Sequence, residues 1–90
     1  MSLKIPTKVK VGGVIYKVKI QEDWLGRDGA DGMVDDKFNQ IYVCSKLSHE
    51  FQEITFIHEI LHCMNSTINH EFLDSLSEQL YALLRDNKLI

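Results

Sequence analysis

The chain has 90 residues, of which 44% are hydrophobic and 26% are charged, with a formal net charge of −3. This size predicts one domain over residues 1–90 with a modest core, so that a bound metal ion would contribute to folding. The acidic balance argues against nucleic acid as the main partner, and no apolar run is long enough to span a membrane. Two cysteines outside any CxxC motif, and no apolar signal core near Met1, are typical of a reduced cytoplasmic protein.

Residues 4–20 predict a β-hairpin. Apolar residues alternate with lysines on both sides of Gly12-Gly13, and glycine accepts the positive φ angles of a tight hairpin turn. We expect the lysines to form one solvated face that protects the sheet from edge pairing. Binding of an anionic surface by these lysines is the alternative.

The next segment, 22–32, interleaves glycine and aspartate and predicts a solvated loop that Trp24 anchors to the core. Two short strands follow, at 33–34 and 40–44, and form a second predicted hairpin. The second of these strands alternates its apolar residues between two faces, as expected for a strand in a sheet.

Two helices complete the chain. Ser48 is a suitable N-cap and Glu50 lies in the first turn, so the first helix is predicted to begin there and to end near Asn65. The second helix is predicted over residues 69–86. The predicted apolar stripes are Ile54, Ile57, Leu61 and Met64 on the first helix, and Leu73, Leu76, Leu80, Leu83 and Leu84 on the second. Two hairpins and two helices predict the α+β class.

The first helix carries the motif His58-Glu59-Ile60-Leu61-His62. Side chains at i and i+4 lie one above the other on a helix, at a spacing that lets two imidazoles bind one tetrahedral zinc. Glu59, one residue after His58, can reach a metal-bound water without occupying a coordination position. This combination of nitrogen ligands, an open metal position and an adjacent base predicts hydrolytic chemistry.

Four segments of the sequence together resemble small phage and bacterial HExxH proteins. These are minimal zincins akin to the peptidase unit of the ImmA/IrrE group. The segments are Gly32-Met-Val-Asp35, Gln40-Ile-Tyr-Val43, Thr55-Phe-Ile-His-Glu-Ile-Leu-His62 and Leu80-Tyr-Ala-Leu-Leu-Arg-Asp-Asn87. The resemblance implies a small twisted β-sheet of two hairpins packed on the HExxH helix and a C-terminal helix. It also implies one catalytic zinc ion (Zn2+) and hydrolysis of a peptide or protein substrate in the cytoplasm of a bacterial host cell.

In that family, the two motif histidines, here His58 and His62, are zinc ligands and the glutamate is the general base. A third ligand, usually Glu, comes from the start of the second helix. An ungapped alignment places His70 at that position, Glu71 next to it, and Asp74 four residues later. At 100° per residue, His70 lies about 60° from the core direction and Glu71 about 160°. We therefore predict His70 as the third ligand, with Glu71 as the alternative, and Asp74 as an acceptor that orients a metal-bound imidazole.

The substrate is predicted to lie along an exposed sheet edge, assigned to the strand at 41–44. Tyr42, Tyr81 and His49 are the candidates for stabilising the oxyanion, and the sequence does not choose among them. A catalytically inactive zinc-binding adaptor or interaction module of phage origin is the alternative function, although a structural zinc site has no need of Glu59. A nucleic-acid-associated protease of the SprT kind would be expected to carry a basic surface or a zinc ribbon. The oligomeric state is left open.

Overall fold

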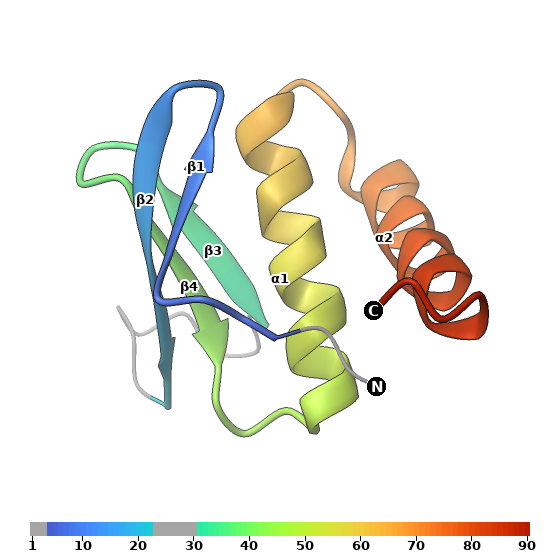
Figure 1. The fold of residues 1–90 in the computed structure, drawn as a ribbon. Helices are drawn as coiled ribbons and strands as arrows, with labels where there is room; N and C mark the ends of the chain where they lie inside the picture. Colours follow the sequence, from blue (N-terminus) through green and yellow to red (C-terminus); the bar gives the residue numbers. More distant parts are fainter. Residues whose placement is uncertain (1–3, 23–30) are drawn as a thin grey trace.

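The computed structural model describes residues 4–22 and 31–90. These residues contain four strands and two helices (Figure 1). The elements are β1 (Lys8–Val11), β2 (Val14–Gln21), β3 (Gly32–Asp35), β4 (Gln40–Cys44), α1 (His49–Met64) and α2 (His70–Asp86). This content confirms the α+β class, and both helices begin and end within a residue of their predicted limits. The predicted anchoring of Trp24 falls outside the described residues.

The strands form one mixed sheet in the order β1-β2-β4-β3. Both hairpins are present, since β1 pairs with β2 and β3 pairs with β4 in antiparallel fashion. In the first turn, Gly12 and Gly13 have φ angles of +57° and +84°, which glycine adopts at low cost. The hairpins are joined by parallel pairing of β2 with β4, where Val18 lies opposite Ile41.

This pairing places β4 between two other strands, so the prediction that residues 41–44 form an exposed edge is wrong. Ile41 and Val43 are completely buried, and a strand with such residues buries more apolar surface in the interior of a sheet than at its edge. Among the described strands, β1 and β3 are the edges. Of these two, β3 is the one that borders the candidate site described below.

The core lies between the sheet and α1, which itself lies between the sheet and α2 (Figure 1). Its buried members are Val11, Tyr16, Val18, Ile41, Val43 and Phe56. The predicted stripe on α1 is wrong at Met64, which is 65% exposed, because the buried face is centred on Phe56 and Ile57. Cys63 is half-buried and packs against this core as a small apolar side chain.

Helix α2 packs on α1 and contacts none of the described strands. Because one helix offers only a narrow surface, the buried face of α2 is limited to Leu73, Ser77 and Tyr81. The predicted leucine stripe is confirmed at Leu73, which is completely buried, but it is wrong at Leu76 and Leu83, which are exposed. The burial of Ser77 is compatible with its hydroxyl because that group donates to the carbonyl of Leu73 within the same helix, at 2.9 Å.

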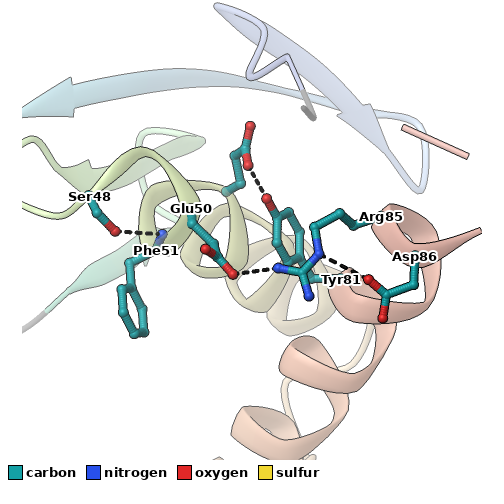
Figure 2. Close-up of polar contacts among 7 residues, drawn as sticks. Ser48, Glu50, Phe51, Tyr81, Arg85 and Asp86 are labelled. Carbon is teal, nitrogen blue, oxygen red and sulfur yellow. Dashed lines mark hydrogen bonds and ion pairs between the residues drawn. The ribbon is translucent and has the colours of Figure 1, made fainter. Parts of the chain in front are cut away.

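Polar contacts fix the far end of the helix pair (Figure 2). The Tyr81 hydroxyl on α2 donates to the buried carboxylate of Glu53 on α1. The guanidinium group of Arg85 forms two ion pairs: Nη1 lies 2.6 Å from Oε1 of Glu50, and Nε lies 3.2 Å from Oδ1 of Asp86. The two helices are thus tied together at the start of α1 and the end of α2, and the opposite end of the pair carries the motif histidines. Neither helix is long and apolar enough to cross a membrane, within the part of the chain described.

Candidate metal and catalytic site

Three histidine rings meet between α1 and α2. His58 and His62 lie one turn apart on α1 with ring centroids 4.9 Å apart, and His70 on α2 lies 5.7 Å from the first and 4.7 Å from the second. One nitrogen from each ring can be chosen so that all three lie within 4.8 Å of one another. Among the described residues, these three side chains form a group of the size and chemistry that could hold a metal ion.

The start of α2 determines where the third histidine lies. Asn69 caps the helix by accepting a hydrogen bond from the backbone N–H of Phe72, at 2.8 Å. The first helical residue, His70, lies beside both motif histidines, whereas Glu71 lies outside the histidine group, and both side chains are exposed. The geometry suits His70 as third ligand, and its role stays a prediction.

Asp74 lies one turn further along α2, and its Oδ1 is 3.0 Å from Nδ1 of His58. The negative charge at that distance favours a proton on Nδ1, and Nε2 is then the lone-pair nitrogen of the neutral ring. Carboxylates in this position commonly orient metal-binding imidazoles. The arrangement therefore suits the orienting role predicted for Asp74.

Burial sets the protonation state of the two motif histidines. Loss of solvation lowers the pKa of His58 and of His62 below the usual value, and the neighbouring His70 lowers both further. The charge of Asp74 opposes this effect at both rings. Lowered pKa values favour neutral imidazoles near pH 7, which is the form that binds a metal.

Glu59 is only 5% exposed, and burial, reinforced by the charge of Asp74, raises the pKa of its carboxyl to about 8. Glu53, one and a half turns earlier on α1, is equally buried but accepts the hydrogen bond from Tyr81. Among the described residues, Glu59 has no hydrogen-bond or ion-pair partner, and its carboxylate oxygens are reached by solvent through the cavity that it lines beside the histidines. A buried carboxylate without such a partner costs stability, which marks Glu59 as a candidate functional group.

Close packing of β3 on α1 forms the wall behind this carboxylate. A Cβ atom added at Gly32 would lie 2.6 Å from Cγ2 of Thr55 and 2.9 Å from Oε2 of Glu59. No side chain fits there without displacing its neighbours, so glycine permits the close approach. Gly32 was predicted to end the 22–32 loop, whereas the structure makes it the first residue of β3, and a glycine in a strand is a common mark of close backbone approach.

The histidines and Glu59 share a cavity of about 710 Å3, whose walls are β3 on one side and α2 on the other. Sequence reasoning did not foresee several of its lining residues, including Asp36, Thr55 and Glu78. Their signal was absent because β3 and the later turns of α2 converge on the cavity only in the folded chain.

The three side chains proposed to stabilise an oxyanion do not line this cavity, so that prediction is wrong. The Tyr81 hydroxyl is directed to Glu53, and the Tyr42 hydroxyl donates to Gln40 within the sheet. His49 is exposed at the start of α1. Each residue type suits the chemistry, but its position is set by packing of the sheet and of the helix pair.

Comparison with protein-family models, with curated proteins and with solved structures gives no match for this chain.

Proposed function

We propose that this protein is a zinc-dependent metallopeptidase with His58, His62 and His70 as metal ligands and Glu59 as general base. The observation that carries the proposal is the position of an unpaired, buried glutamate in the same cavity as three converging histidines. The resemblance to minimal zincins supports the same conclusion, because the histidines and the glutamate occupy the positions of the HExxH motif.

The donor set fits zinc. In a tetrahedral site with Zn–N bonds of 2.0–2.1 Å, ligand nitrogens lie roughly 3.3 Å from each other. The three histidine nitrogens lie within 4.8 Å, so small side-chain rotations suffice to bring them to this spacing. Three protein ligands also leave a fourth position open, as catalytic zinc sites require.

Zinc bound there would act as a Lewis acid that acidifies water and polarises the scissile carbonyl. Glu59 would take the proton of the attacking water and return it to the leaving amine. A neighbouring cation lowers the pKa of a carboxylate, which would favour the ionised form of this base. Asp74 would hold the His58 ring with Nε2 directed to the metal.

The substrate backbone would lie along β3, which replaces the strand at 41–44 as the proposed docking edge. β3 pairs with β4 on one side only, and Gly32, Met33 and Val34 line the cavity. An extended peptide can add to such an edge through main-chain hydrogen bonds. This placement would bring the scissile bond past the histidines without a second lobe of protein.

The proposal is tested by metal content and peptide hydrolysis in two proteins. The wild type should contain one zinc per chain and cleave an unstructured protein substrate such as casein. Glu59→Gln should retain the zinc and lose at least about a hundredfold in rate, because removal of a general base costs 10²–10⁴-fold. Hydrolysis that persists in Glu59→Gln would refute the assigned mechanism. Stoichiometric zinc with no hydrolysis by the wild type would instead favour the zinc-binding adaptor.

A further inference from the structure

Besides Glu59, four carboxylates line the cavity around the histidines, and among the described residues no lysine or arginine lines it. They come from both walls: Asp31 and Asp36 lie on either side of β3, and Asp74 and Glu78 lie one turn apart on α2. All four are exposed, so their charges face the space that a substrate would fill. The cavity is therefore an anionic cleft with a positive centre only when a metal is bound.

The two carboxylates beside β3 flank the histidines along the cleft. Asp31 immediately precedes β3 and Asp36 immediately follows it, so the two residues lie at opposite ends of the strand that forms one wall of the cavity, and both line that cavity. Negative charge is thus present on both sides of the point where a scissile bond would lie. A substrate that crosses the centre would pass one carboxylate before it and another after it.

Three of these four carboxylates have no ion-pair partner in the part of the chain that the structure describes. Within the described ranges, Asp31, Asp36 and Glu78 form no ion pair, whereas Glu22 is 3.3 Å from Lys46 and Glu50 is paired with Arg85. The hairpin lysines do not compensate the cleft. They alternate with core-facing residues on β1 and β2, so they lie on the sheet face turned away from α1.

A second observation shows that the cleft is built for a ligand. Glu59 is only 5% exposed and has no hydrogen-bond or ion-pair partner among the described residues. Its side chain lines the same cavity. Like charges in one cleft destabilise the protein unless a cation relieves them. One divalent metal ion does not balance four rim carboxylates together with Glu59.

We propose that the site takes cationic peptide segments, with lysine or arginine on both sides of the scissile bond. This inference rests on the proposed peptidase function and specifies its substrate class. The rim carboxylates would attract the cationic segment to the cleft and hold its side chains on either side of the histidines. Asp36 and Glu78 are assigned as specificity residues on opposite walls.

The first experiment compares three fluorogenic peptides that differ only in the residues flanking one scissile bond: lysine, alanine or glutamate. With the zinc-loaded wild type, kcat/KM should be about tenfold or more higher for the lysine peptide than for the alanine peptide, and lowest for the glutamate peptide. The difference should shrink in 0.5 M salt because the rim charges are screened.

Variants then locate the origin of the preference. Asp36→Asn together with Glu78→Gln should reduce the lysine-over-alanine ratio of kcat/KM severalfold, because the two side chains no longer attract the cationic segment. Glu22→Gln is the matched control, since it removes one exposed negative charge outside the cavity. An equal reduction in Glu22→Gln would show that net charge, rather than the cleft, produces the preference.

Binding to zinc-loaded Glu59→Gln, measured by fluorescence anisotropy, separates this inference from the proposed function. Hydrolysis of all three peptides at equal kcat/KM overturns the inference and leaves the peptidase function intact. No hydrolysis by the wild type, combined with tighter binding of the lysine peptide, overturns the peptidase function and supports a cleft for cationic segments. Equal binding of the three peptides overturns the inference in either case.

Discussion

The carboxylate of Asp74 on α2 lies 3.0 Å from Nδ1 of His58 on α1, so that one contact joins the two helices at the candidate metal centre. The charge of this carboxylate favours a proton on Nδ1, which leaves the Nε2 lone pair of the neutral ring for a metal. We expect Asp74→Ala to weaken zinc binding by roughly 10–100-fold, as found for residues that orient metal ligands. Competition with a chromophoric chelator measures this affinity. Glu71→Ala serves as the control, and equal affinities in the two variants would contradict the orienting role.

The third ligand is tested by a second pair of variants. His70→Ala should weaken zinc binding far more than Glu71→Ala, because His70 lies beside both motif histidines and Glu71 lies outside the group. Loss of the metal should also lower the thermal unfolding midpoint, since metal binding and folding are linked. Calorimetry with and without excess zinc gives both quantities. The reverse order of affinities would identify Glu71 as the ligand.

Much of the architecture was predictable because it depends on local signals. The glycine pair of the first turn and the caps Ser48 and Asn69 act through backbone conformation and hydrogen bonds within a few residues. The parallel pairing of β2 with β4 was not predictable in this way, since it joins segments separated by β3. For that reason the docking edge was assigned to the wrong strand.

The residues of the candidate site likewise include some that local spacing predicts and others that depend on packing in the folded chain. The motif spacing placed His58, Glu59 and His62 on one helix, and helix phase brought His70 toward them. The buried face of α2 was less accessible to sequence reasoning, because Ser77 and Tyr81 are buried in place of Leu83. Polar residues at those positions are satisfied by specific partners, which hydrophobic periodicity does not register.

The hydrogen bond between Tyr81 and Glu53 predicts a large effect for a small change. Tyr81→Phe should lower the free energy of unfolding by about 1–3 kcal/mol, because the buried Glu53 acceptor loses its donor. Glu50→Gln, which alters the exposed pair with Arg85, should change it by less than about 1 kcal/mol. Urea denaturation measures both values. If the two variants are equally stable, the buried contact contributes no more than the exposed one.

The close approach at Gly32 predicts that even a methyl group is poorly tolerated there. Gly32→Ala should destabilise the protein by about 1–3 kcal/mol, because the new Cβ overlaps the Thr55 methyl group and the Glu59 carboxylate. Activity should fall more than stability alone explains, since the general base is displaced. Gly13→Ala is a useful contrast: its added Cβ meets no atom within 4 Å, so its cost comes from backbone conformation alone. Wild-type activity in Gly32→Ala would refute the contact with Glu59.

The raised pKa of Glu59 predicts how the stability of the metal-free protein depends on pH. In the unfolded chain the carboxyl ionises near 4.5, whereas in the folded protein its pKa is about 8, so between these values the folded state binds more protons. The contribution of Glu59 to the free energy of unfolding is therefore most favourable at low pH. It decreases as the pH rises from about 4.5 toward 8, because the carboxyl then ionises more readily in the unfolded chain than in the folded protein. Removal of this carboxylate should thus stabilise the metal-free protein increasingly from pH 5 to pH 8.

Glu59→Gln isolates this contribution, because the motif histidines, whose lowered pKa values act in the opposite direction, are present in both proteins. The stability of Glu59→Gln relative to the wild type should increase by on the order of 3–4 kcal/mol between pH 5 and pH 8, at about 1.36 kcal/mol per pKa unit. Urea denaturation in the presence of a chelator at both pH values measures the difference. A difference that does not change with pH would mean that Glu59 is solvated in the folded protein. Added zinc should reduce the effect in the wild type, because a nearby cation favours the ionised carboxylate.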